Sequence, residues 1–405
     1  MYGGFFLEKI TYESEPNKPE LAEWILILLY QLVIIFGILQ VSMYKYYLTG
    51  GWMNKVVLLS AALMVVMATF FFKRSLDQWL VFLIFTLFAA LNFQKTGNTQ
   101  YLLFISVVFG FSGIKNKKVF QVSLCTSIAL IFFIFLMSKL GFIDNLSYIR
   151  GGYMRQSFGL IYPLTFSSYI FFICCLFVVS VDKINSYVEA AILVGTALLV
   201  LRYTNSRNDA LSIILLALAL LVNKLHPIIK EKLINIGIVI MPIVAFFSVF
   251  VSKIISNNSP LRGIVNSIAS DRLYLQDELF NYFSPKLFGQ VIAENGNGGL
   301  EGKNVILGYF YIDSSYTRIF FLGGILIFIG YVLIWMRGVR KQKLNSNYLI
   351  SFILFIIWIN GITQDNAQNA IFDFMMPILF MDNLKISKSK DMAKLDKKNS
   401  LENYV

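Results

Sequence analysis

The chain has 405 residues, of which 57% are hydrophobic and only 14% are charged, and its formal net charge is +12. A water-soluble domain has about a quarter charged residues, so this composition excludes a soluble globular protein. The mean hydropathy of +0.67 leads to the same exclusion. The sequence therefore predicts an all-α, polytopic membrane protein whose lysines face anionic lipid, with no nucleic-acid partner.

Apolar runs near the length of about 20 residues that crosses a bilayer as a helix divide the chain. The fourth, seventh and eighth runs are short, so ten or eleven spans would also fit the pattern. The twelve predicted spans are 22–42, 55–72, 78–94, 100–114, 119–141, 162–181, 187–203, 209–223, 233–252, 316–336, 347–364 and 368–382. They form one membrane domain over residues 1–385, followed by a charged tail, 386–405, that we expect to be disordered. The mixed polar N-terminus predicts no cleavable signal peptide.

Lysine and arginine are concentrated in alternate connections between these spans. The basic stretches are 73–74, 115–118, 183, 224–232, 337–343 and 385–398. By the positive-inside rule, both termini are predicted to be cytoplasmic. The long polar loop over residues 253–315 then lies on the outer face, and we expect short helices within it.

Three polar clusters near membrane depth fall on the same outer side as this loop. They are residues 150–163 with Arg150 and Arg155, residues 202–209 with Arg202 and Arg207, and residues 364–369 with Asp365. Outer arginines oppose the positive-inside rule, and arginine suits bidentate contact with phosphate. Two simpler explanations stay open: single arginines could contact lipid headgroups, and the last cluster could be a turn with a helix cap.

The loop contains a predicted amphipathic helix that starts near Asp271, a candidate N-cap, and ends before Pro285. Its apolar stripe is formed by Leu275, Leu279 and Phe283. Arg272 lies on the same stripe, so a charged partner is expected beneath it.

Metal and cofactor chemistry have little support in the sequence. The three cysteines, Cys125, Cys174 and Cys175, lie in apolar runs and are predicted to be packing residues. The single histidine is His226, and the first outer connection, 44–55, has no carboxylate. No phosphate-binding G-x-x-x-x-G-K-[ST] motif occurs, so we expect neither a metal nor another cofactor.

Four short segments resemble motifs of one family. They are Arg155-Gln-Ser-Phe-Gly-Leu-Ile-Tyr-Pro163, Asn205-Ser-Arg207, Ser270-Asp-Arg272 with Lys286-Leu-Phe-Gly289, and Ile312-Asp-Ser-Ser-Tyr316. Over residues 100–385 their order resembles bacterial polysaccharide polymerases of the Wzy type and the related O-antigen ligases. The chain departs from the pattern at Tyr162-Pro-Leu164, where the family has His-Pro-Asn, and the outer-loop histidine of the ligases is missing. This departure disfavours ligase activity.

The resemblance implies a C-type glycosyltransferase fold acting on undecaprenyl-diphosphate-linked oligosaccharides at the outer face of a bacterial plasma membrane. The product would be an O-antigen, capsule or exopolysaccharide, with membrane lipid, a flippase and a chain-length regulator as partners. We expect Asp313 or Asp271 to orient the acceptor hydroxyl, and Arg207 to stabilise the leaving group. The predicted substrate-binding residues are Arg150, Arg155, Arg202, Arg272, Tyr316 and Asp365. The alternatives are a flippase or another transporter of lipid-linked units, and a polysaccharide ligase.

Overall fold

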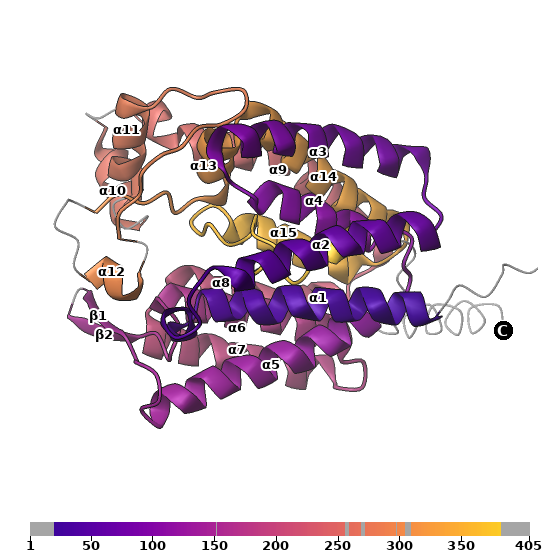
Figure 1. Ribbon diagram of the computed structural model, residues 1–405, viewed down its shortest axis with the longest axis horizontal. Helices are drawn as coiled ribbons and strands as arrows, with labels where there is room; N and C mark the ends of the chain where they lie inside the picture. Colours follow the sequence, from indigo (N-terminus) through magenta and orange to yellow (C-terminus); the bar gives the residue numbers. More distant parts are fainter. Residues whose placement is uncertain are drawn as a thin grey trace, which may run out of the picture.

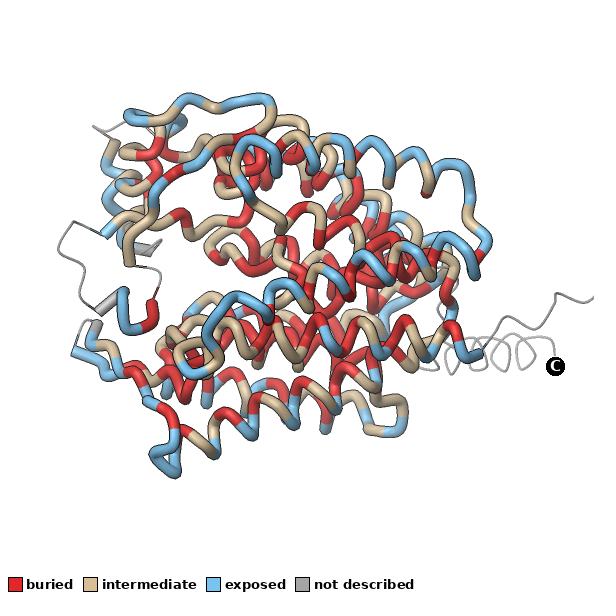
Figure 2. The backbone as a smooth tube through the Cα atoms, viewed as in Figure 1, coloured by how far each residue is buried: buried red, intermediate tan, exposed pale blue. Residues whose placement is uncertain are grey.

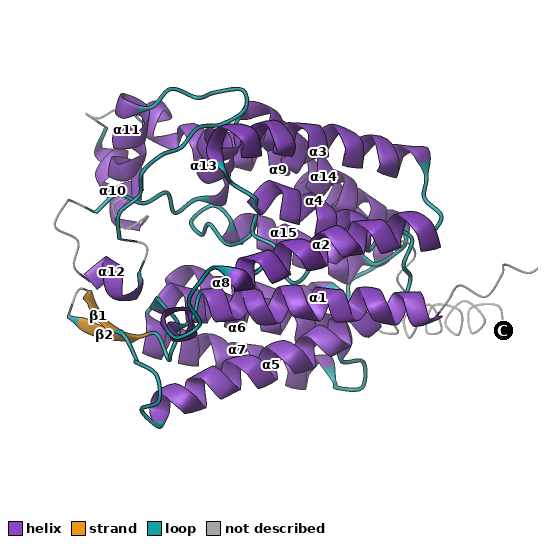
Figure 3. Ribbon diagram, viewed as in Figure 1, coloured by secondary structure: helices purple, strands orange, loops and turns teal. Residues whose placement is uncertain are grey.

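The computed structural model describes residues 20–150, 152–255, 259–268, 272–296, 298–303 and 309–381. Long helices run side by side between two ends of one bundle (Figure 1). One end, here called the loop end, carries a hairpin of β1 (Ser147–Arg150) and β2 (Tyr153–Gln156). The short helices α10 (Pro260–Ile268), α11 (Arg272–Tyr282) and α12 (Gly299–Lys303) lie at the same end (Figures 1 and 3).

Among the residues that the structure describes, seven helices are long and apolar enough to cross a membrane. They are α1 (Glu20–Gln40), α2 (Trp52–Phe71), α3 (Leu76–Thr96), α5 (Lys118–Lys139), α6 (Pro163–Ser180), α7 (Ser186–Thr204) and α9 (Pro227–Ile254). The other bundle helices are α4 (Gln100–Gly110), α8 (Arg207–Val222), α13 (Ser315–Arg318), α14 (Ile325–Leu344) and α15 (Tyr348–Asn360). The predicted all-α, multi-pass membrane class is confirmed at this level, and the first eleven predicted spans each correspond to a helix, although the tenth is interrupted.

The outward faces of these helices are apolar, as contact with lipid requires. Figure 2 shows exposed positions along the outer edges of the bundle and buried ones between the helices. Phe70 of α2 is 78% exposed and Leu198 of α7 is 60% exposed, whereas Trp335 and Trp358 are buried at the contact of α14 with α15. A soluble protein would hide the first pair of side chains, so their exposure supports a membrane setting.

The predicted span 316–336 is not one continuous helix. A π-helical turn, η2 (Ile319–Gly323), follows α13, and Gly324 then breaks the helix with φ +97°. The upstream loop that contains Lys286 docks on this break, where the backbone N–H of Ile325 donates to Lys286 O at 3.1 Å. Asn92 of α3 donates to Leu322 O at 2.8 Å and so satisfies a backbone group that the break leaves unpaired.

Replacing Gly324 with alanine should destabilise the protein by at least about 2 kcal/mol. A Cβ there would lie 2.3 Å from Gly289 N and 2.5 Å from Leu287 O, in a backbone conformation that L-residues avoid. Gly195→Ala on α7 is the matched control, since its Cβ would meet nothing within 4 Å. The thermal midpoint of each purified variant in detergent measures the difference, and equal midpoints would contradict the docking of this loop.

The prediction of a twelfth helix at 368–382 is wrong. Residues 361–381 form turns and one short 3-10 helix, η3 (Met376–Leu379), buried among the other helices. Side chains satisfy this irregular backbone: Tyr331 donates to Ala367 O at 3.1 Å and Tyr169 to Ile371 O at 3.2 Å. Non-helical backbone is tolerated at membrane depth only inside protein, and this segment lies there. Its apolar residues therefore face protein rather than lipid.

Candidate functional site

A polar cavity of about 230 Å³ opens at the loop end of the bundle. The ends of α1, α4 and α6, the chain from 309 to 318 and the 361–381 segment surround it. Its uncharged polar lining consists of Gln100, Tyr162, Thr165, Tyr309, Tyr311, Gln364, Asn366 and Asn369. Convergent polar groups in a concave site are typical of ligand binding, so this cavity is the candidate site.

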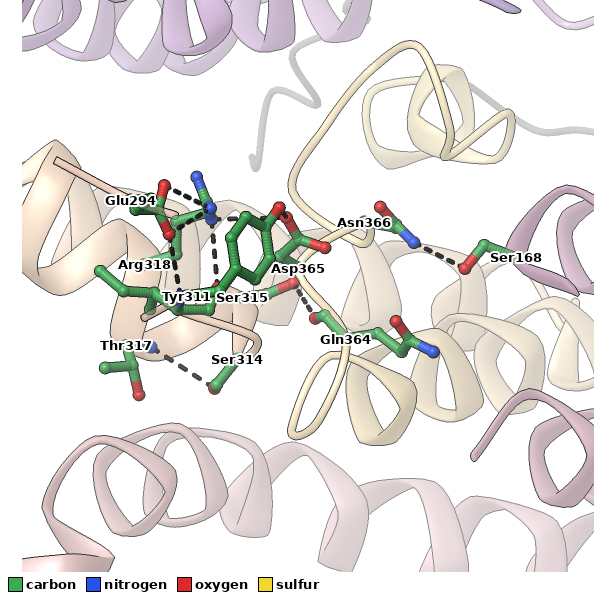
Figure 4. Close-up of polar contacts among 11 residues, drawn as sticks. Ser168, Glu294, Tyr311, Ser314, Ser315, Thr317, Arg318, Gln364, Asp365 and Asn366 are labelled. Atoms are coloured by element: carbon green, nitrogen blue, oxygen red, sulfur yellow. Dashed lines mark hydrogen bonds and ion pairs between the residues drawn. The ribbon is translucent and has the colours of Figure 1, made fainter. Parts of the chain in front are cut away.

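Arg318 is the centre of a buried ionic network beside the cavity (Figure 4). Its Nη2 donates to both carboxylate oxygens of Glu294 at 2.7 Å, and its Nε lies 3.4 Å from Asp365 Oδ2. Tyr311 places its ring 4.8 Å from the guanidinium and donates its hydroxyl to Asp365 at 2.6 Å. Burial raises the pKa of Glu294, and the positive charge of Arg318 opposes this rise. The network fixes Asp365 at the cavity wall.

Arg272 of α11 forms an ion pair with Asp313, with Nε and Oδ2 3.0 Å apart. The expectation of a charged partner beneath Arg272 is therefore confirmed. Asp313 lines the polar cavity and also a second, mainly apolar cavity of about 200 Å³ between α9 and α11. This pair thus lies on the wall between the two cavities.

The buried face of α11 differs from the predicted stripe. Leu273, Gln276 and Leu279 are buried, whereas Leu275 and Phe283 are only half-buried. Gln276 shifts the face, because its amide donates to Ser248 O of α9 at 2.7 Å and accepts from the Ser252 backbone N–H at 2.9 Å. A polar contact with the helix end below therefore overrides the apolar periodicity.

Asp209 joins three elements below the cavity. It is buried near the start of α8 and accepts hydrogen bonds from Ser206 at 2.8 Å, Ser167 at 2.5 Å and Asn360 at 3.1 Å. Gln364 donates to the same carboxylate at 3.3 Å. Asp209 therefore links α6, α8 and α15 to the 361–381 segment, which is a positioning role.

The predicted arginines divide into buried and exposed groups. Arg155 is 2% exposed, and its Nε donates to Thr204 O at 2.7 Å, which ties the β-hairpin to the end of α7. Arg202 and Arg207 have exposed side chains. Within the described parts of the chain, neither makes an ion pair or a side-chain hydrogen bond. They flank the turn at Asn205, where φ is +50°, and present two unneutralised cations at the loop end.

Tyr316 lies apart from both cavities, so the expectation that it binds substrate is not supported. Its side chain is 1% exposed, its hydroxyl donates to Trp358 O, and its ring packs on Trp358. The side chain of Arg150, at the end of β1, is outside what the structure describes, and so are Asp271 and the tail at 386–405.

The sequence analysis missed Arg318 and did not single out Glu294, Tyr311 or Asp209 as central residues. Arg318 lies two residues inside the predicted tenth span, and an arginine in an apolar run is an available signal for a functional or paired site. Its partners, in contrast, are 24 and 47 residues away in sequence, so no spacing rule identifies them. Among the described residues, no group of three His, Cys, Asp or Glu side chains could hold a metal ion.

Comparisons with known proteins assign no family to the chain, since no family model, no curated protein and no solved structure matches it. The fold and the site therefore define a class, a multi-pass helical membrane protein with a polar cavity at one end of its bundle. Function has to be argued from the residues of that cavity.

Proposed function

We propose that this protein is a C-type glycosyltransferase of the bacterial plasma membrane that polymerises undecaprenyl-diphosphate-linked oligosaccharides. The observation that carries the proposal is the polar cavity, which contains carboxylates and amides. Its lining residue Gln364 donates to Asp209, two residues after the exposed Arg207 in the turn that also bears the exposed Arg202. The carboxylates and amides of the cavity suit a sugar, and the two arginines of the turn suit a diphosphate. The segments that resemble motifs of the Wzy-type polymerases suggest the same reaction, and the predicted cytoplasmic position of both termini would place the cavity on the outer face.

In the proposed reaction, an acceptor sugar hydroxyl attacks the anomeric carbon of the donor. A new glycosidic C–O bond forms, the bond from that carbon to the diphosphate breaks, and polyprenyl diphosphate leaves with the electron pair. Asp313 is the first candidate to orient the hydroxyl and accept its proton, and Asp365 lines the same cavity. Asp271 remains the second candidate from the sequence motif.

Arg207 and Arg202 are the proposed ligands of the donor diphosphate, together with Arg150. Preorganised positive charge near the leaving oxygen stabilises the transition state without a metal ion. Arg155 has a different proposed role: it holds the hairpin against α7 through Thr204, and so positions the neighbouring arginines. Arg272 is already paired with Asp313, so it is assigned to the carboxylate rather than to phosphate.

Transport of the lipid-linked unit is the second candidate, and one observation favours it. The irregular 361–381 segment lies inside the bundle, and many transporters bind substrate at such discontinuous segments. The polar cavity, however, lies at one end of the bundle, whereas a carrier needs a polar path from one face to the other. Glycosyl transfer is therefore the better supported function.

Cells lacking the gene should accumulate single lipid-linked repeat units on the outer face of the membrane and contain no polymer. Extraction of lipid-linked glycans, combined with labelling by a membrane-impermeant reagent, measures the length of the glycans and the face on which they lie. Units confined to the cytoplasmic face would overturn the proposal in favour of a flippase. Intact polymer that stays on its lipid carrier would do so in favour of a ligase.

A further inference from the structure

The charges around the polar cavity are unsuited to an anion. Asp313, Arg318 and Asp365 line it, and their ionic partners are Arg272 and Glu294. Three carboxylates thus accompany two guanidinium groups in this part of the described chain. The cluster carries one net negative charge when all five groups are ionised.

Arg318, the cation in the described lining, already pairs with two carboxylates through its Nη2 and Nε atoms. Glu294 binds it bidentately at 2.7 Å, Asp365 lies on its Nε, and the Tyr311 ring covers one face. The side chain is only 13% exposed, so Glu294 and Asp365 already compensate its charge before any ligand binds. A ligand anion that displaced either carboxylate would leave an uncompensated buried charge, which is strongly unfavourable.

The remaining lining suits a ring that carries hydroxyl groups. Amides such as Gln100 and Asn369 offer both donors and acceptors, and Asp365 offers acceptors. Tyr162 and Tyr309 add aromatic surface that can pack on the apolar face of a sugar. Hydroxyl and ammonium groups can donate to these carboxylates, whereas a ligand carboxylate can only accept hydrogen bonds and repels them.

We infer that the polar cavity is a carbohydrate subsite for a sugar ring that carries no negative charge, either a neutral or an amine-bearing sugar, and that it rejects uronic acids. The assignment of this subsite to the acceptor sugar rests on the proposed function. The cavity can nevertheless be tested as a binding site without any polymerisation.

The test uses full-length protein in detergent and matched sets of methyl glycosides in the gluco, galacto and manno series. Each set contains the hexoside, the 2-amino-2-deoxy hexoside and the uronide, which share ring stereochemistry and differ in charge. Saturation-transfer NMR at pH 7 gives the relative affinities. In at least one series, the neutral and amino sugars should bind about tenfold or more tightly than the uronide, because like charges repel in a partly buried site.

Asp365→Asn separates charge repulsion from shape. The variant keeps a polar group of the same size beside Tyr311, and Arg318 keeps its bidentate partner Glu294. The preference against the uronide should fall to within about threefold, because the excess carboxylate is gone. Asp144→Asn is the control, since Asp144 is exposed between α5 and β1 and does not line the cavity.

Three results would overturn the inference: uronides that bind as well as the neutral sugars, no binding in any series, or unchanged selectivity in Asp365→Asn. Failure of the proposed function is a separate result. Selective binding of neutral and amine-bearing sugars by a protein whose gene is dispensable for polymer would leave the subsite in place and remove the polymerase assignment.

Discussion

Cells that carry Arg207→Ala in place of the native protein should make little or no polymer and accumulate single lipid-linked units. Arg207 is exposed and makes no ion pair or side-chain hydrogen bond within the described residues, so we expect its removal to leave the fold intact. The expected loss is roughly 100-fold or more in transfer rate, the scale seen when one group that stabilises developing negative charge is removed. Polymer length on gels and the amount of extracted single units measure the effect.

Two further variants decide whether the loss of polymer comes from a lost contact with phosphate. Arg207→Lys keeps the charge but not the planar fork, so it should retain part of the activity. Arg340→Ala removes an exposed arginine from α14 and should leave polymer unchanged. Arg155→Ala is less informative, because it also removes the hydrogen bond to Thr204 O. Polymer of normal length and amount in Arg207→Ala would refute the diphosphate role.

Arg318→Ala should be the most destabilising single change at the site. It would leave Glu294 and Asp365, which are 15% and 21% exposed, without the cation that lies between them. Removing one partner of a buried ion pair costs about 3–5 kcal/mol, mainly because the remaining charge stays desolvated. The thermal midpoint of the purified protein in detergent, at constant detergent concentration, reports this loss.

Neutralising the partners tests the electrostatic cause. The triple variant Arg318→Ala, Glu294→Gln, Asp365→Asn has no uncompensated carboxylate in the network, so it should be more stable than Arg318→Ala alone. Such non-additivity is the signature of coupled residues. Two results would show that the network does not hold this end of the bundle together. They are a wild-type midpoint in Arg318→Ala, and a triple variant that is less stable than Arg318→Ala.

Hydropathy located most of the bundle correctly because a lipid-facing helix must be apolar along its whole length. It failed at residues 368–382, since an apolar run indicates apolar surroundings and does not distinguish lipid from protein interior. The same limit explains the tenth span. The break at Gly324 depends on a loop more than 30 residues earlier that docks against it, and hydropathy contains no information about that contact.

The site shows a similar division. The polar clusters at 202–209 and 364–369 and the inward charge of Arg272 were visible in the sequence, because charge near membrane depth is expensive and therefore conspicuous. Their partners were not visible. Asp313 lies 41 residues from Arg272, and the interior position of Tyr316 depends on a contact with Trp358.

Hydropathy and charge along the chain were enough to predict the membrane class, the positions of most helices, and the gathering of polar residues on one side of the bundle. All three follow from the transfer free energies of consecutive residues, which are local properties of the chain. The packing of the helices was needed to show which carboxylate neutralises which arginine, which arginines stay exposed, and that the last apolar run packs irregularly inside the protein. Those features depend on distances between residues far apart in sequence, and such distances arise only when the helices pack.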